Sequence, residues 1–449
     1  DIEAEIEPDE CGTTYHYRAY ATNLGGTTYG SDQTFATNAC PPSFATGFIT
    51  TWKTDNPGST ASNQVRLSFG TINGYEVDWG DGNTQSTSSS NPIHTYASPG
   101  TYTIRVMGDI RSFNANSTGN PAKLLTVEQW GDVEWRSMDF AFWNAANLQI
   151  NAVDAPDLSR VTSLLNMFFN ATSFNSDISQ WDTSTITNMT GMFNGATSFN
   201  QSLNGWDTSN VINMNNMFIL ASSFNSDISQ WDTSNVESMN TMFSNTPFNQ
   251  PLNDWNTSKV RSMVGMFQNN TTFNQPLNDW DTTALEWSGN MFYYATSFNQ
   301  PLNNWDTSKV TDMGWMFGGA SSFNQPLDSW DTSSLTYTTY TFAGATSFNQ
   351  SLSNWDMSNV TNMVSMFAGA TSFNQSLASW DMQNVRWATV ALNNTALSME
   401  NYDFTLAGWA AQDLQNDVYL GAAPTKYCYS ADARQSIIND YNWTITDGG

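Results

Sequence analysis

Apolar residues return at fixed places about every 25 residues through the middle of the chain. From roughly residue 173 to residue 386, the chain repeats a motif close to Ser-Phe-Asn-Gln-Pro-Leu-Asn-Asp-Trp-Asp-Thr-Ser-x-Val-x-x-Met-x-x-Met-Phe. The tryptophan of this motif occurs nine times and so marks nine units, at Trp181, Trp206, Trp231, Trp255, Trp280, Trp305, Trp330, Trp355 and Trp380. A unit this short cannot bury its own apolar face and must stack on its neighbours. The period therefore predicts a solenoid whose function lies on a long surface.

Each unit is expected to hold one short strand and one short helix. Apolar residues three and four apart run from Val260 to Phe267, and this spacing predicts the buried stripe of a short α- or 3-10 helix. The Asp-Thr-Ser before such a stripe supplies side-chain oxygens that cap the first amides. The strand is expected at residues 273–277, where Pro276 lacks an amide donor and limits the strand to about three residues.

Aspartate follows the repeated tryptophan in eight of the nine units. Stacking would align these carboxylates about 5 Å apart, where each adjacent pair costs on the order of 1 kcal/mol in a water-like dielectric. We expect hydrogen bonds to nearby amides to offset this repulsion. A calcium ladder is the alternative, but one unit carries Asn256, which keeps the capping oxygen and loses the charge. The tryptophans themselves are either core residues or stacked sugar platforms, and their recurrence beside Leu and Phe favours the core.

Period-two alternation in residues 1–40 predicts strands around a Gly25-Gly26 turn. The run Gly-Thr-Thr-Tyr-His-Tyr-Arg-Ala-Tyr-Ala-Thr-Asn, residues 12–23, resembles the late strands of a fibronectin type III domain, with Tyr15 in the place of the tyrosine corner. So few strands are marginal in water, so they belong to a divided domain or are completed by strands of another chain. Cys11 and Cys40 bracket the segment, which favours a disulfide between them.

Residues 41–108 show a second set of short strands with turn signals, as in a small sandwich. Val-Asp-Trp-Gly-Asp-Gly at residues 77–82, followed by His-Thr-Tyr at 94–96 and Pro-Gly-Thr-Tyr at 99–102, resembles the polycystic-kidney-disease (PKD) module of secreted bacterial proteins. Asp78 and Asp81 are candidate cation ligands, but Asp-Gly is foremost a hairpin turn signal. We therefore expect an immunoglobulin-like PKD sandwich and no metal.

The 25-residue units, with their Phe-Asn-Gln, Trp-Asp-Thr-Ser and Asn-Met-x-x-Met-Phe motifs, resemble BspA-type leucine-rich-repeat surface proteins of bacteria. The resemblance implies a surface-exposed or secreted bacterial protein with adhesive or partner-binding roles and no enzymatic activity. The expected architecture is multidomain, with β-sandwich segments followed by a leucine-rich-repeat-type α/β solenoid of short parallel strands and short helices. Its expected parts are a partial fibronectin-like segment (1–40), a PKD-like sandwich (41–108), an entry cap (109–166), the solenoid (167–392) and an exit cap (393–449).

The 14 basic and 41 acidic residues give a net charge of -27, which repels nucleic acids and anionic lipid head groups. No apolar run is long enough to insert in a membrane, and the opening Asp-Ile-Glu-Ala-Glu is no signal sequence, so we expect a mature product or a fragment. The two histidines, His16 and His94, lie in β patterns and exclude a histidine-based triad or metal site in the solenoid. We predict no enzyme and no cofactor. Cys428 is either a buried thiol or an intermolecular bridge.

A binding surface should break the repeat, and the later units do so. The residue two after the conserved Val or Leu becomes aromatic in alternate units, while the methionine after it becomes Ser288, Thr338 or Ala388. The predicted contact patch comprises Trp287, Trp315, Tyr337, Tyr340 and Trp387, with Tyr293 and Tyr294 nearby. These rings either repack inside the protein, in the volume that methionine leaves, or form an exposed patch that binds protein or glycan.

The leading functional prediction is a non-catalytic extracellular surface or matrix protein that uses a rigid repeat scaffold for adhesion or assembly. Strand complementation at the amino-terminal partial domain would polymerise it head to tail. The alternative is a carbohydrate-binding protein that recognises polysaccharide through aromatic residues on the solenoid.

Overall fold

Runs of β-branched and aromatic residues, broken by turn residues, form the sheets that precede the repeats. The computed structural model describes residues 14–23, 25–36 and 46–449. The strands from residue 46 onward are β5 (Phe48–Lys53), β6 (Gln64–Arg66), β7 (Phe69–Asp78), β8 (Thr84–Thr87), β9 (Ile93–Thr95), β10 (Thr101–Phe113), β11 (Leu124–Gln129) and β12 (Gln149–Ile150). Six of them pair in the order β12-β11-β5-β10-β7-β8, and β6 pairs with β9. Two 3-10 turns, η1 (Asn116–Thr118) and η2 (Pro121–Lys123), precede β11.

The amino-terminal described residues form a two-part antiparallel hairpin. Its strands are β1 (Thr14–Tyr17), β2 (Tyr20–Asn23), β3 (Gly26–Tyr29) and β4 (Gln33–Ala36). β1 pairs with β4, and β2 pairs with β3 at the tip. Tyr17, Tyr20 and Tyr29 are exposed on it. The predicted Cys11–Cys40 disulfide lies outside the described residues.

The Met-x-x-Met-Phe segment forms two successive tight turns, so the predicted helix is wrong. The Met266 amide donates to the Met263 carbonyl (3.1 Å), and the Asn270 amide donates to the Phe267 carbonyl (3.0 Å). The first and last residues of both turns are buried. The buried side chains are therefore three and four positions apart in the sequence although no helix forms. No helix lies between β12 and the carboxyl-terminal cap in the described chain. The molecule is mostly β in character.

Backbone geometry explains why these turns do not continue into a helix. The third residue of each turn has a positive φ, 62° at Gly265 and 56° at Asn269. Type II turns require this conformation, which Gly and Asn adopt most readily. The Gly265 amide then points out of its coil and donates to the Gly289 carbonyl of the next coil (2.9 Å). Hydrogen bonds therefore run between coils, where a helix would keep them within one.

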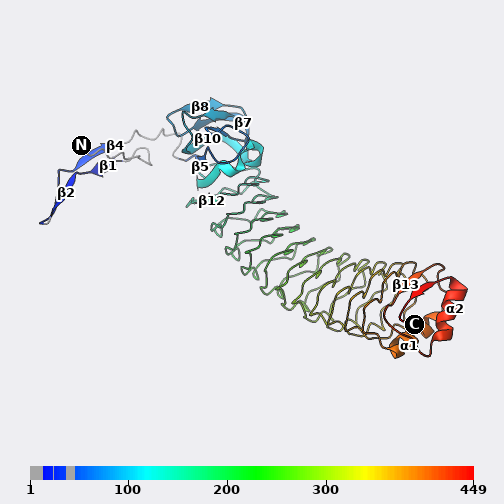
Figure 1. The fold of residues 1–449 in the computed structure, drawn as a ribbon. Helices are drawn as coiled ribbons and strands as arrows, with labels where there is room; N and C mark the ends of the chain where they lie inside the picture. Colours follow the sequence, from blue (N-terminus) through cyan, green and yellow to red (C-terminus); the bar gives the residue numbers. More distant parts are fainter. Residues whose placement is uncertain (1–13, 24, 37–45) are drawn as a thin grey trace.

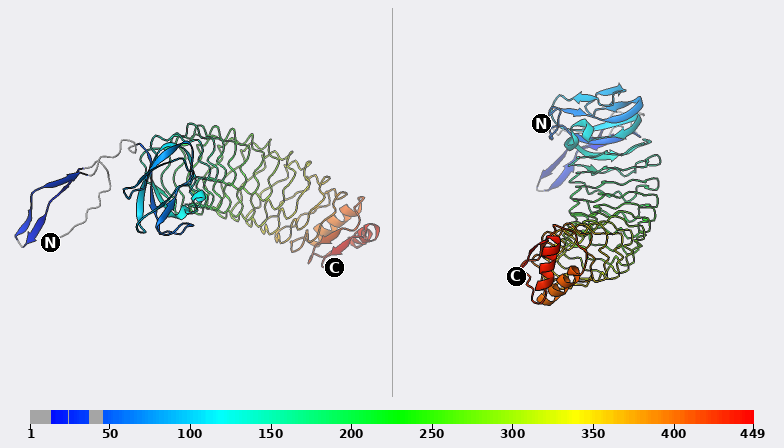
Figure 2. Two further views of the ribbon diagram at one scale, coloured as in Figure 1. Left: turned by 90° about the horizontal axis from the view of Figure 1, so that it is seen from above. Right: turned by 90° about the vertical axis from the view of Figure 1, so that its right-hand side faces the viewer.

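The coils follow one another in a curved column (Figure 1, Figure 2). One parallel bridge per coil joins the residue two after the recurring Val, Ile or Leu to its counterpart in the next coil, as in Asn188 to Asn213 and Ser262 to Trp287. The prediction of parallel pairing is thus confirmed, but its position is wrong. Residues 273–277 form no strand. There the Asn274 amide donates to the side-chain Oδ1 of Asn249 (3.0 Å), so a side chain replaces the backbone partner.

Buried Trp, Phe and Leu, joined in most coils by Met, fill the interior of the column. The repeated tryptophans are at most 6 % exposed, and the indole of Trp305 donates to the Leu277 carbonyl of the preceding coil (2.8 Å). Phenylalanines stack from coil to coil, as Phe292 on Phe317 with ring centroids 5.6 Å apart. The prediction that the tryptophan column is core is confirmed.

The aspartate after each tryptophan caps a turn. Asp281 Oδ1 accepts from the Thr283 amide (3.0 Å) and the Thr283 hydroxyl (2.7 Å). The hydroxyl and the amide together hold the pKa of Asp281 below its ordinary value. Asn256 accepts from Ser258 in the same way (3.1 Å). The expected capping bonds are confirmed, although they begin a turn and no helix.

The sandwich and the column share one core. β11 pairs with β12 in parallel, and Ser112 at the end of β10 bridges Ser137. Trp130 meets the first repeat tryptophan, Trp181, edge-on at 5.5 Å between centroids. Because apolar packing is continuous across this junction, the sandwich is a fixed end of the column.

The carboxyl end of the column carries a cap of two helices and two strands. These are α1 (Met399–Ala410), β13 (Tyr419–Gly421), α2 (Ala431–Tyr441) and β14 (Thr444–Thr446), and Leu420 bridges Ala388 of the last coil. The Asp403 carboxylate accepts from the amides of residues 428–430 and thereby ties α1 to the start of α2. Cys428 is exposed and unpaired, so the expected buried thiol is wrong. No described helix is long and apolar enough to cross a lipid bilayer.

Candidate functional site

The bridge residues of successive coils form a ladder along the column, and its chemistry changes partway. We call this row the bridge ladder; it comprises Ser163, Asn188, Asn213, Ser238, Ser262, Trp287, Asp312, Tyr337, Asn362 and Trp387. The first half is made of Ser and Asn alone. The second half alternates aromatic rings with one carboxylate and one amide.

Side chains in the first half of the bridge ladder bond to one another across coils. Asn188 donates to the Ser163 hydroxyl (3.2 Å). Asn215 lies two residues after the ladder residue Asn213. Its Oδ1 accepts from the Ser238 hydroxyl (2.6 Å) and the Asn240 amide (2.7 Å) of the next coil. Because these polar atoms satisfy each other, this half offers few open hydrogen-bonding groups to a ligand.

The aromatic residues in the second half face solvent. Trp287 is 43 % exposed, Tyr337 is 51 % exposed and Trp387 is 52 % exposed. The small residues that follow them, Ser288 and Thr338 among them, are buried. The rings therefore do not fill the interior volume that methionine leaves, and internal repacking is wrong for these three positions. No ring contact joins the three aromatic side chains among the described residues, so each presents its own surface.

Asp312 and Asn362 lie between the exposed rings on the bridge ladder. Asp312 Oδ1 accepts from the Gly314 amide (2.7 Å), and Asn362 Oδ1 accepts from the Val364 amide (3.0 Å). Their other polar atoms, Asp312 Oδ2 and Asn362 Nδ2, make no hydrogen bond with any described residue. Neither residue belongs to the contact patch predicted from the sequence. Their register, 25 residues from an aromatic on either side, is the signal that would have found them.

The remaining predicted residues form a separate, tighter cluster on the turns. Trp315 and Tyr340 stack with centroids 3.8 Å apart, and Tyr293 meets Trp315 edge-on at 5.1 Å. Tyr294 packs against Tyr293 at 4.6 Å. Burial, and then the neighbouring Tyr294, raise the pKa of Tyr293. These rings stabilise one another, so the structure divides the predicted patch into an exposed ladder and a packed turn cluster.

The turn cluster includes backbone conformations that bulky residues rarely adopt. Tyr294, Trp315 and Tyr340 have φ values of 53°, 59° and 58°, at turn positions that in many other coils carry Gly or Asn. A bulky residue in the left-handed region costs about 1 kcal/mol or more. Ring stacking offsets part of that cost.

Charged groups flank the first exposed ring. Arg261 lies over the Trp287 ring at 5.7 Å and pairs with Glu286 (2.7 Å). Glu286 and Trp287 line a shallow hollow of about 310 Å³ together with Lys309 and two hydroxyl residues, Thr311 and Ser334. An aromatic wall beside hydrogen-bonding groups suits a polar ligand that also has an apolar face.

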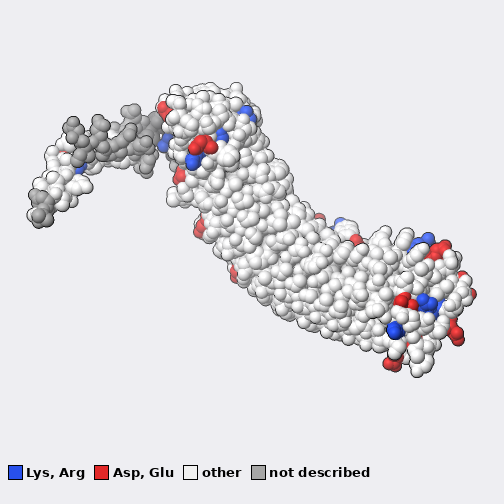
Figure 3. Space-filling view, viewed as in Figure 1, with Lys and Arg blue, Asp and Glu red and all other residues white. Residues whose placement is uncertain are grey.

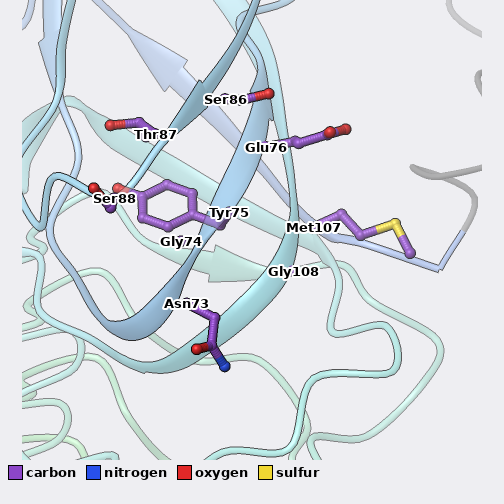
Figure 4. Close-up of a pocket in the computed structure, with 9 residues that line it drawn as sticks. All are labelled: Asn73, Gly74, Tyr75, Glu76, Ser86, Thr87, Ser88, Met107 and Gly108. Atoms are coloured by element: carbon purple, nitrogen blue, oxygen red, sulfur yellow. The ribbon is translucent and has the colours of Figure 1, made fainter.

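Other hollows lie away from the bridge ladder, on the sandwich and at the carboxyl-terminal cap. The one in Figure 4, on the sheet formed by β7, β8 and β10, has a volume of about 590 Å³. Tyr75 points toward Ser88 there, whereas Glu76 and Met107 point away from the ring. An apolar hollow at the cap lies between α1 and α2, beside Phe404 and Cys428.

Both histidines are paired with carboxylates, and the two acids weighed as cation ligands are engaged. His16 bonds Asp32 (2.6 Å) and His94 bonds Asp81 (2.8 Å). Although burial would raise the pKa of Asp81, hydrogen bonds from His94 and Asn83 lower it. Asp78 lies 3.5 Å from Arg105. Within the described ranges, no group of three or more metal-ligating side chains converges.

Charge is unevenly distributed over the molecule. In the view of Figure 3, charged side chains gather on the sandwich and on the carboxyl-terminal cap, and the visible face of the column shows few. The column therefore offers mainly uncharged surface on that face.

Comparison with known proteins identifies both parts of the chain. The family described as Mycoplasma protein of unknown function, DUF285, matches residues 136–247, 227–320 and 300–404. The PKD domain family matches residues 41–119. No curated protein and no solved structure matches the chain.

Proposed function

Because this chain belongs to the family described as Mycoplasma protein of unknown function, DUF285, and also carries a PKD domain, we propose that it is a non-catalytic bacterial surface or matrix protein that attaches through its repeats. Both families support an extracellular, surface-type repeat protein. The column is the attachment scaffold, and the late half of the bridge ladder is its contact surface.

The exposure of alternate rings on an otherwise regular column carries this proposal. Trp287, Tyr337 and Trp387 depart from the Ser and Asn of the first half, while the buried tryptophan column continues beneath them. Exposed aromatic side chains arranged along a line provide contact energy for a partner. The inter-coil hydrogen bonds hold them in place before the partner arrives, which lowers the entropy cost of binding.

Attachment of protein-coated beads to bacterial cells and matrix tests the proposal. The variant Trp287→Ala/Tyr337→Ala/Trp387→Ala is expected to lose most attachment. A matched control, Ile212→Ala/Leu220→Ala, removes side chains that are 45 % and 50 % exposed on the early coils and should attach like the parent. Circular dichroism melts check that all variants fold. Equal attachment by the aromatic variant and the parent would refute the proposed contact surface.

We propose in addition that the column is a variant of the leucine-rich-repeat solenoid seen in BspA-type surface proteins. One short parallel bridge per coil and a stacked Phe, Leu and Met interior support this kinship. The coils differ in replacing the helical half with tandem turns. An experimental structure that shows the same bridge positions, from residue 163 to residue 387, would test it.

Self-assembly through the amino-terminal hairpin is a second proposed role. The hairpin places Tyr20 opposite Tyr29 at its tip, both more than half exposed, and Arg18 lies over the Tyr29 ring at 4.0 Å. Strands that expose aromatic side chains suit completion by another copy of the chain. Mass photometry of the parent and of Tyr20→Ser/Tyr29→Ser tests it, because strand complementation predicts oligomers that the variant loses.

A further inference from the structure

The exposed rings repeat along the column with a period of two coils. Neighbouring parallel strands lie about 4.8 Å apart, so rings on alternate coils are separated by roughly 10 Å. Trp287, Tyr337 and Trp387 therefore form three platforms in a line, with Asp312 and Asn362 halfway between them. A surface with translational repeat fits a ligand that repeats over the same distance.

Two kinds of extended chain repeat differently. An extended peptide places equivalent side chains about 6.6 Å apart, which does not match the platforms. A polyproline II peptide advances about 9.3 Å in three residues, which does match. An extended β-1,4-linked glycan also turns the same ring face to a surface every second sugar, at a similar distance. The spacing of the platforms by itself is thus compatible with two ligands, a proline-rich peptide and a linear glycan.

The groups between the platforms separate these two ligands. The Asp312 carboxylate has an open Oδ2, and an ionised carboxylate only accepts hydrogen bonds. Sugar hydroxyls can donate to it and can also accept from the open Nδ2 of Asn362. A proline-rich strand offers carbonyl acceptors and few donors, so it would leave the carboxylate unsatisfied. The alternation of ring, acceptor, ring, donor, ring therefore favours a hydroxyl-rich ligand.

Charge narrows the ligand further. Asp312 lies on the bridge ladder itself, and the whole chain carries a net charge of -27. Beside the first ring, Glu286 is paired with Arg261, and Lys309 lines the same hollow, so the charges there are mixed. The net negative charge of the chain as a whole repels anionic polysaccharides. An uncharged glycan meets no such barrier, and its pyranose faces stack on exposed aromatic rings.

Building on the proposed attachment surface, we propose that the late half of the bridge ladder binds an uncharged, linear β-1,4-linked polysaccharide that runs along the column axis. Every second sugar stacks on Trp287, Tyr337 and Trp387 in turn, and the intervening sugars hydrogen-bond to Asp312 and Asn362. Five consecutive sugars span the three platforms, so the affinity of the site depends on the length of the glycan as well as on the chemistry of its sugars.

Isothermal titration calorimetry on the full chain tests this with cellobiose, cellotetraose, cellohexaose and hexaacetylchitohexaose. Affinity is expected to rise with length until five sugars are covered. Loss of the middle platform in Tyr337→Ala should weaken hexasaccharide binding roughly tenfold, because it removes a central aromatic contact. Tyr337→Phe keeps the ring and should bind nearly like the parent, and Ile212→Ala on the early coils serves as the matched control.

The outcomes separate this inference from the proposed attachment surface. If neither hexasaccharide binds, while bead attachment still depends on the three rings, the glycan is wrong and the contact surface stands. If a proline-rich peptide binds the ladder and the glycans do not, the partner is a protein and the inference is overturned. Length-independent binding, or equal loss in Ile212→Ala, also contradicts it. Anionic alginate oligomers should bind more weakly than cellohexaose; the reverse would overturn the charge argument.

Discussion

The early and the late coils of the column share most of their interior and differ at their surfaces. Phe and Trp occupy the same buried positions in both, whereas buried methionines of the early coils are replaced in some late coils by small residues such as Ser288 and Thr338. On the bridge ladder, however, early coils carry Ser and Asn that bond to each other, and late coils carry exposed rings separated by open polar atoms. Stacking between coils therefore determines the fold, and the outward-facing positions, which it does not constrain, can carry residues that bind a partner.

The largest expected effects lie in the shared interior. Trp206 and Trp330 are 3 % and 2 % exposed, and their indoles donate to Ile178 (3.1 Å) and Leu302 (2.9 Å). Replacing either by Ala should lower the free energy of unfolding by about 3–5 kcal/mol, because each leaves a cavity and an unpaired carbonyl. Thermal and denaturant melts measure it. A much smaller cost in one region would mean that the two halves do not share one core.

An intermediate effect should distinguish the two halves of the bridge ladder. Asn213→Ala removes an oxygen that accepts from the Asn215 amide (2.9 Å) and from the Thr190 hydroxyl of the preceding coil (2.9 Å), so it should cost about 1–3 kcal/mol. Asn362→Ala removes one bond within its own coil and should cost about 0.5 kcal/mol. Equal costs in denaturant melts would show that the late coils contain a closed polar network as well.

Backbone strain provides a smaller effect of opposite sign. Leu220 has a φ of 62° and is 50 % exposed, at a position where other coils use Asn or Gly. Leu220→Asn should therefore raise stability by about 1 kcal/mol. In Tyr294→Asn the same relief is offset by the lost contact with Tyr293, so the gain should be smaller. A larger gain for Tyr294→Asn in parallel melts would contradict the stabilising role of the turn cluster.

The smallest expected difference between the halves is their response to acid. Hydrogen bonds from the following Ser or Thr lower the pKa of Asp182, Asp232, Asp281 and Asp331, which lie in both halves. A lowered folded-state pKa stabilises the protein above the unfolded value of about 4, and this contribution is lost as pH falls through the folded value. Melting temperatures should fall below about pH 4. Replacing Asp182 or Asp331 by Asn keeps the cap and should reduce the acid response equally; an unequal change would separate the halves.

Much of the architecture was predictable because burial follows the period. The tryptophan and phenylalanine columns, the parallel pairing and the aspartate caps all come from residues that recur in every unit. The strand position was not predictable, because in the Phe-Asn-Gln segment Asn249 replaces a backbone partner with its side chain. The aromatic residues of the site were found from their departure from the repeat. Asp312 and Asn362 were missed, since single polar residues are common at exposed positions of any repeat.

By itself, the sequence determined that units stack and which side chains they bury, because no unit of this length can cover its own apolar face. Only the tertiary structure decided between helix and tandem turns, since both give apolar spacings of three and four. The deciding factor is the next coil: amides such as that of Gly265 bond to its carbonyls and hold φ positive. The same inter-coil register decides which rings of the late half face solvent and which polar atoms remain open.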